Sequence, residues 1–115
     1  NKLEKGGLSG KPLEKRSNEL INKFYKILKN KIKIIGVGGV DSGQSAYQKI
    51  INGASLVQLY TGMIYQGPSI ASKISEELIN ILDKEGAKNI SDVVGSKNWS
   101  WLVTLEHLYN HKFYV

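Results

Sequence analysis

The sequence predicts an α/β fold in which β-α units form a parallel sheet, and three observations carry that prediction. Two short apolar runs, residues 32–37 and 55–60, are each followed closely by glycine. Residues 42–52 between them have the length and pattern of one helix, which Gly53 closes. Short apolar runs bounded by turn residues are typical of strands buried on both faces of a parallel sheet. The order strand, helix, strand therefore predicts a βαβ unit.

The segment before the first strand is expected to be a loop followed by a helix. Residues 6–13 (GGLSGKPL) are rich in glycine and have no strand of their own before them. Ser17 is the expected N-cap of the helix, and lysines up to Lys31 complement the dipole at its end. The apolar residues between them recur at helical spacing: Leu20, Ile21, Phe24, Ile27 and Leu28.

The remaining elements follow the same alternation. Asp41 or Ser42 is expected to cap the helix between the strands. The predicted inward residues of that helix are Ala46, Tyr47, Ile50 and Ile51. After the second strand come a short turn at residues 63–65 and then Pro68, which suits the first position of a helix. That last long helix has one apolar face and is expected to stop at Gly86.

The composition limits the possible function classes. The chain has 115 residues and no cysteine, which excludes disulfides and thiolate chemistry. Residues 1–31 hold nine Lys/Arg and three Asp/Glu, and this difference of six equals the net charge of +6. The charge distribution favours a solvated basic face over a nucleic-acid site. No run approaches about 18 apolar residues, so no membrane segment is predicted and the chain itself is expected to be soluble.

Residues 96–115 differ in character from the part before them and form a separate, aromatic-rich tail of unknown role. Both tryptophans, Trp99 and Trp101, lie there, as do His107 and His111. The histidines stand four residues apart, but no third ligand accompanies them, so no metal site is predicted. A docking helix and an extension foreign to the fold both stay open for this tail.

The glycines that follow the two strands predict an anion-binding site. Gly38 and Gly39 come after the first strand, and Gly62 comes after the second. Glycine lets the backbone approach a ligand closely, and the amides there and at the start of the next helix are expected to lack partners. Because adjacent parallel strands end at the same edge, the two loops could form one phosphate cradle, as in a (β/α)8 barrel.

Four motifs resemble the C-terminal portion of class 2, quinone-dependent dihydroorotate dehydrogenase. They are GGLSGKPL at 6–13, IIGVGGVDSG at 34–43, KIINGASLVQLYTGMIYQGP at 49–68 and ISDVVG at 90–95. The resemblance implies that residues 1–95 are the last βα units of an FMN-binding TIM (β/α)8 barrel, incomplete in this chain. It also implies an oxidoreductase, a flavoprotein that oxidises (S)-dihydroorotate to orotate with quinone as acceptor in de novo pyrimidine (UMP) biosynthesis. Such an enzyme would lie peripherally on the cytoplasmic side of the membrane.

The resemblance further implies which residues hold the FMN cofactor. The matching positions are Gly10, Gly39, Tyr60 and Thr61, with Gly38 and Gly62 as neighbours. Their backbone amides would carry the flavin phosphate, and glycine at 10 and 39 would keep side chains away from the flavin. The family's serine base, flavin-contacting lysine and orotate-holding asparagines have no match here, so no catalytic residue is predicted. Ser9, with no adjacent base, is expected to be a turn residue.

The chain alone is therefore expected to be inactive, with dihydroorotate and quinone as substrates of the full enzyme. An uncovered sheet face and edge would favour self-association or pairing with the missing N-terminal part. Two other hypotheses stay open. One is a non-catalytic partial barrel, or inactive fragment, that binds FMN or phosphate. The other is a small basic nucleic-acid-binding module, which is disfavoured because all the excess charge precedes residue 32.

Overall fold

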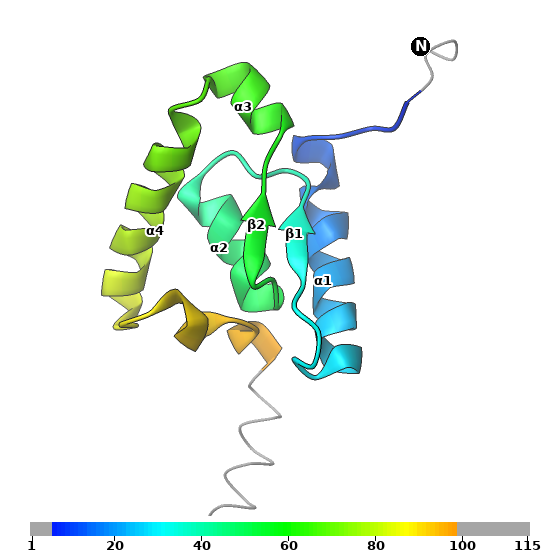
Figure 1. Cartoon of the computed structure of the whole chain (residues 1–115), viewed down its shortest axis with the longest axis vertical. Helices are drawn as coiled ribbons and strands as arrows, with labels where there is room; N and C mark the ends of the chain where they lie inside the picture. Colours follow the sequence, from blue (N-terminus) through cyan, green and yellow to red (C-terminus); the bar gives the residue numbers. More distant parts are fainter. Residues whose placement is uncertain (1–5, 99–115) are drawn as a thin grey trace, which may run out of the picture.

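A parallel βαβ unit lies at the centre of the computed structural model, which describes residues 6–98 (Figure 1). Strands β1 (Ile35–Val37) and β2 (Leu56–Gln58) pair in parallel, with Ile35 opposite Leu56 and helix α2 (Gly43–Asn52) between them in the chain. The other elements are η1 (Lys11–Leu13), α1 (Glu14–Leu28), α3 (Thr61–Gln66), α4 (Ile70–Glu85), η2 (Ile90–Val93) and η3 (Ser96–Asn98). The predicted α/β class and strand-helix-strand order are confirmed, although both strands are shorter than predicted.

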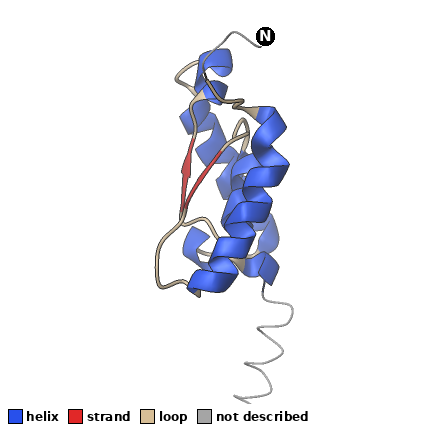
Figure 2. Cartoon of the chain, turned by 90° about the vertical axis from the view of Figure 1, so that its right-hand side faces the viewer, coloured by secondary structure: helices blue, strands red, loops and turns tan. Residues whose placement is uncertain are grey.

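Only one face of the sheet is covered by the described helices. Figure 2 shows the two strands along the left edge of the molecule with the long helices to their right. On the open face, Ile35, Val37 and Leu56 are 56%, 50% and 62% exposed. The prediction that the strands are buried on both faces is therefore wrong for this part of the chain, because no element between residues 6 and 98 packs on the second face.

The main core lies between α2, α4 and the covered face of the sheet. Its buried members are Val40, Ala46, Ile70 and Ile74, with Val57, Leu59 and Leu78 packed against them. On α2, Ala46 and Ile50 are buried as predicted, whereas Tyr47 and Ile51 are only half-buried. The same face also buries polar residues that the apolar pattern did not predict, namely Ser45, Lys49 and Asn52. Lys49 can be buried here partly because Gly36 has no side chain. A Cβ atom at Gly36 would lie 3.0 Å from Lys49 Cδ and from Ala54 Cβ.

Two predicted helix starts are wrong. Helix α1 begins at Glu14, directly after η1, so Ser17 lies inside the helix instead of capping it. Helix α4 begins at Ile70, and Pro68 belongs to the turn before it. The segment predicted as a short turn at residues 63–65 is part of helix α3. At α1 the cause is η1, which runs directly into the helix and moves its start towards the N-terminus.

The start of α2 is held by its own side chains and by α4. Ser42 is the N-cap, as one of the two predicted alternatives, and its Oγ accepts a hydrogen bond from the Ser45 amide at 3.1 Å. Ser45 Oγ in turn accepts from the Ser42 amide at 3.0 Å, which completes a capping box. The Gly43 amide donates to the Glu77 carboxylate on α4. The predicted stop of α4 at Gly86 is confirmed, with a left-handed φ of 72°.

An amide cluster ties the last described turn to α1 and α2. Asn22 Nδ2 donates to Asn52 Oδ1 at 3.1 Å and to Asn98 Oδ1 at 2.8 Å. Asn52 and Asn98 are each only 3% exposed. Residues 96–98 therefore pack against the fold. The four tail residues Trp99, Trp101, His107 and His111 lie outside the described residues.

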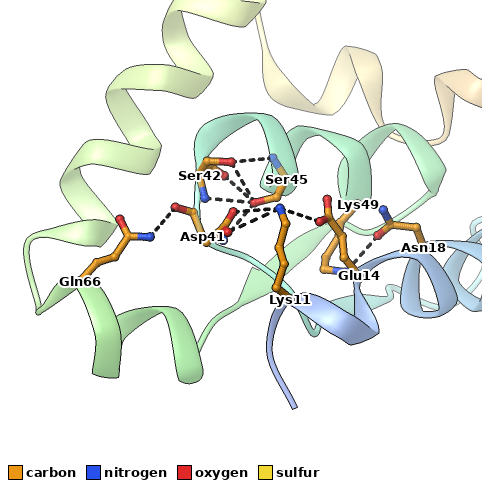
Figure 3. A network of polar contacts seen from close by, with 8 residues as sticks. All are labelled: Lys11, Glu14, Asn18, Asp41, Ser42, Ser45, Lys49 and Gln66. Atoms are coloured by element: carbon orange, nitrogen blue, oxygen red, sulfur yellow. Dashed lines mark hydrogen bonds and ion pairs between the residues drawn. The ribbon is translucent and has the colours of Figure 1, made fainter. Parts of the chain in front are cut away.

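Lys49 is the one charged side chain that is fully buried among the described residues, with 0% exposure. Its Nζ donates to Ser17 Oγ at 3.0 Å and to Asn18 Oδ1 at 2.9 Å, both on α1 (Figure 3 shows Asn18). Burial lowers the pKa of the Lys49 ammonium from its ordinary value, and the Glu14 carboxylate opposes that shift. The lysine joins α2 to α1 without an ion pair within residues 6–98.

Replacing Ser42 with alanine is expected to lower the free energy of unfolding by about 1 kcal/mol, because the Ser45 amide loses its cap. Ser69→Ala is the matched control. Ser69 is also an N-cap serine, at the start of α4, but its side chain accepts no capping bond. Urea unfolding of both variants measures the difference. Equal losses in the two variants would contradict a specific role for the capping box.

Lys49 is expected to make stability depend on pH in the alkaline range. Between its lowered folded pKa and the ordinary 10.5, the unfolded chain binds more protons, so stability rises with pH. Tyr47, whose pKa is raised by burial and then by Glu85, acts in the opposite direction but equally in wild type and Lys49→Met. The unfolding free energy of wild type should therefore rise relative to that of Lys49→Met as pH rises towards 10.5. A difference that is constant from neutral pH upward would contradict this expectation.

Candidate anion-binding site at the strand ends

The carboxyl ends of β1 and β2 open into one cavity of about 520 Å³. Three segments line it: the loop before η1, the loop after β1 and the loop that leads from β2 into α3. All six residues that the sequence analysis singled out line this cavity: Gly10, Gly38, Gly39, Tyr60, Thr61 and Gly62. They converge because parallel strands end at the same edge of a sheet, where ligand sites of α/β proteins lie.

A second hollow, of about 770 Å³, lies between α1, α2 and η3. None of the six residues lines it. Its floor includes the amide cluster of Asn22, Asn52 and Asn98, whose side chains already bond one another. The smaller cavity at the strand ends is therefore the candidate site.

A side-chain hydrogen bond fixes the first loop over the end of β2. Ser9 and Thr61 join through their hydroxyl oxygens at 3.0 Å. The Gly10 carbonyl accepts from the Leu13 amide at 3.0 Å, which starts the turn of η1. Ser9 thus bonds a hydroxyl and not a base, and it lies in a loop and not in a turn.

Glycine is required at positions 10 and 39 for backbone geometry and for close packing. Gly10 and Gly39 have φ values of 82° and 75°, which side chains disfavour. A Cβ atom at Gly10 would lie 3.0 Å from Thr61 Cγ2, and one at Gly39 would lie 2.5 Å from Glu14 Cβ. At position 39 the absent side chain would point at α1, so glycine there lets α1 approach the loop. The expectation that it keeps a side chain out of the ligand space is corrected accordingly.

The two helices that follow the strands differ in what their first amides can offer. At α2 the Gly43 amide is bound by Glu77 and the Ser45 amide by Ser42, so the expectation of unpartnered amides there is wrong. At α3 no side chain caps the first turn, which begins at Thr61. The amides at the start of α3 thus differ from those of α2 in having no side-chain cap, although the Met63 amide donates to the Tyr60 carbonyl at 3.1 Å.

Lys11 and Asp41, which line the cavity, form a cluster of three charged side chains with Glu14, which does not line it (Figure 3). Lys11 Nζ lies 2.8 Å from Glu14 Oε2 and 3.5 Å from Asp41 Oδ2. The hydrogen bond to Glu14 is the main cause that raises the pKa of Lys11. Gln66 Nε2 donates to the Asp41 carbonyl at 3.1 Å, which ties α3 to the loop after β1.

Sequence reasoning named Asp41 only as an alternative helix cap and did not single out Lys11 or Gln66, although all three line the cavity. Lys11 stands inside the GGLSGKPL motif and Asp41 inside IIGVGGVDSG, so position within a motif was a usable signal for both. Gln66 carried no comparable signal, because it reaches the site only through the helical turn of α3. The cavity is thus lined by the two glycine loops, with the polar side chains of Lys11, Asp41 and Gln66 beside them.

Within residues 6–98, no helix is both long and apolar enough to cross a membrane. The same part of the chain holds no group of three or more side chains of the kinds that ligate metals.

Comparisons with known proteins agree on one family. Residues 1–82 match the family described as dihydroorotate dehydrogenase. The dihydroorotate dehydrogenase (quinone) of Trichodesmium erythraeum is 50% identical over 95 residues, which make up 83% of this chain and 25% of that protein. The protein of the same name from Deinococcus radiodurans is 44% identical over 95 residues, 83% of this chain and 26% of that protein.

Solved structures give the same result. The crystal structure of DHODH from Eimeria tenella in complex with ferulenol superposes with a TM-score of 0.79 at 42% sequence identity. The superposition covers 83% of this chain and 25% of that one, so the chain spans about a quarter of the length of the relatives it matches. With a family match over 82 of its 115 residues, the chain belongs to the dihydroorotate dehydrogenase family.

Proposed function

We propose that this chain supplies the FMN phosphate-binding part of a quinone-linked dihydroorotate dehydrogenase. The whole enzyme would oxidise (S)-dihydroorotate to orotate in de novo pyrimidine biosynthesis. One observation carries the proposal: the six positions that match the family's FMN motifs line a single cavity at the ends of two paired parallel strands. The relatives named above, two of them called dihydroorotate dehydrogenase (quinone), support the reaction and the acceptor.

The residues of this cavity fit the phosphate end of FMN. A phosphate needs several hydrogen-bond donors that converge without intervening side chains, and we expect these to be backbone amides of the glycine loops that line the cavity. The volume of about 520 Å³ lies in the usual range for a small-molecule site. When bound, FMN would supply the redox chemistry of the reaction. The residues described here would hold and orient it.

The open face of the sheet is where we place the remainder of the enzyme. Ile35, Val37 and Leu56 form an exposed apolar row beside the cavity. The preceding βα units of a TIM barrel, from a longer polypeptide or a second chain, would cover this row and carry the catalytic base. Without them, self-association through the same face is the expected alternative. A quinone acceptor would place the complete enzyme at a membrane surface.

A second candidate is a non-catalytic partial barrel that binds FMN or phosphate. The observation in its favour is that the hydroxyl of Ser9, which lines the cavity, is bonded to Thr61 instead of to a base. Turnover separates the two readings. Oxidation of dihydroorotate with a soluble quinone should require added polypeptide that supplies the earlier barrel strands, and the 115-residue chain alone should be inactive.

FMN affinity of the purified chain is the direct test of the cradle. The wild-type chain should quench FMN fluorescence saturably, and Gly39→Ala should weaken binding at least about tenfold, because the new Cβ displaces the loop from Glu14.

Gly86→Ala is the matched control for backbone strain. Gly86 has nearly the same φ, 72° against 75° at Gly39, but has no atom near its missing Cβ and ends α4 away from the cavity. That variant should bind FMN as wild type does. Unchanged affinity in Gly39→Ala, or equal losses in both variants, would contradict the proposed site.

A further inference from the structure

The burial of Lys49 requires an explanation that packing does not supply. Lysine is among the residues least often fully buried, since removing an ammonium group from water is costly. Here the side chain is 0% exposed, and its two hydrogen-bond acceptors, on Ser17 and Asn18, are neutral. The Glu14 carboxylate acts on this ammonium group but forms no ion pair with it, so the buried charge is an unfavourable way to join two helices. Through Ser17, its hydrogen bonds connect it to Val37 at the end of β1.

The contacts of Lys49 form a directed chain of hydrogen bonds. Lys49 Nζ has only protons to give when charged, so Ser17 Oγ accepts from it at 3.0 Å. The Ser17 hydroxyl is then left to donate its own proton, and it does so to the Val37 carbonyl. The donor that begins the chain is an ammonium, which strengthens the bond that follows. The three groups together form what we call the Lys49 relay.

The relay ends on the peptide that opens the candidate phosphate site. Val37 is the last residue of β1, and its carbonyl shares a peptide plane with the Gly38 amide. In a trans peptide the carbonyl and the amide point in opposite directions, and the described residues contain no cis peptide bond. A carbonyl held by Ser17 therefore turns the Gly38 amide away from α1. Gly38 lines the cavity, whereas Ser17 and Lys49 do not.

The glycine pair needs such an external constraint. Gly38 and Gly39 have φ values of 100° and 75°, in a region where glycine moves readily among conformations. Glycine permits the geometry that an anion site requires but does not by itself select that geometry. Ser17 supplies a constraint of this kind, because its hydroxyl donates to the carbonyl of the peptide just before the pair.

We propose that Lys49 is a positioning residue for the phosphate site: acting through Ser17, it fixes the Val37–Gly38 peptide so that the Gly38 amide faces the cavity. The proposal rests on the proposed function in one respect, namely that the ligand of the cavity is the phosphate of FMN. Lys49 itself touches no ligand. A lysine that merely joined α1 to α2 would affect folding stability and leave ligand affinity unchanged.

Two variants interrupt the relay at different points, and a third serves as control. Lys49→Met keeps the length of the side chain but removes the donor, and Ser17→Ala removes the link while leaving the lysine in place. Ile50→Val is the control, because Ile50 is the buried neighbour of Lys49 on α2 and loses one methylene without touching the relay. For each variant, FMN affinity is measured by fluorescence quenching and stability by the thermal unfolding midpoint.

Each relay variant is expected to weaken FMN binding about tenfold, the effect of misdirecting one amide donor. The double variant should lose no more than the weaker-binding single variant, because both changes break one chain of bonds. Ile50→Val should lower the unfolding midpoint and leave FMN affinity within about twofold of wild type. If both relay variants bind FMN as tightly as Ile50→Val, or if their losses simply add, the relay does not position the site.

A measurement without ligand separates this proposal from the function on which it rests. If wild type itself fails to bind FMN, the proposed function fails, and the amide resonances of Gly38 and Gly39 in the unliganded full chain decide on the relay. They should shift in Lys49→Met and in Ser17→Ala and stay in place in Ile50→Val. Resonances that are unchanged in the two relay variants would overturn the proposal, whatever ligand the cavity takes.

Discussion

The parallel pairing of β1 with β2 is the constraint on which the other features of this structure depend. Because Ile35 lies opposite Leu56 and the strands run the same way, both strands end at one edge and both following loops open there. The connection must then cross over the sheet, and α2 does so while it packs on α4. The cavity is a product of that register. Neither glycine loop alone would enclose it.

Much of the fold could be predicted because it depends on residues that are close together in the sequence. Ser42 as a cap and Gly86 as a stop each depend on a few neighbouring residues, and both are found as expected. The wrong predictions concern tertiary context. Ser17 has the chemistry of an N-cap, but η1 runs directly into α1 and places it one turn inside the helix, where it bonds β1. An apolar strand pattern likewise predicts that both faces are covered, but not whether the covering element lies in the same part of the chain.

The candidate site shows the same division between local and tertiary information. The glycine motifs predicted which backbone segments would meet, and all six named residues line one cavity. The side chains around them were less accessible to sequence reasoning. Gln66 reaches the rim only because α3 turns it back onto Asp41, and Lys49 stands at an apolar-face position of α2 that is typical of a core residue. Periodicity predicts that such a position faces the interior, but it does not predict that the lysine side chain hydrogen-bonds residues of α1.

The missing side chain at Gly36 couples residue size at two positions that are distant in the sequence. A Cβ atom there would lie 3.0 Å from Lys49 Cδ and 3.1 Å from Ile21 Cδ1, so the stem of the lysine occupies the volume that a larger residue in β1 would claim. Interiors packed at this density tolerate exchanges that conserve volume far better than single enlargements. Residue size at positions 36 and 49 should therefore covary among homologues, with any side chain gained in the strand accompanied by a shorter one on the helix.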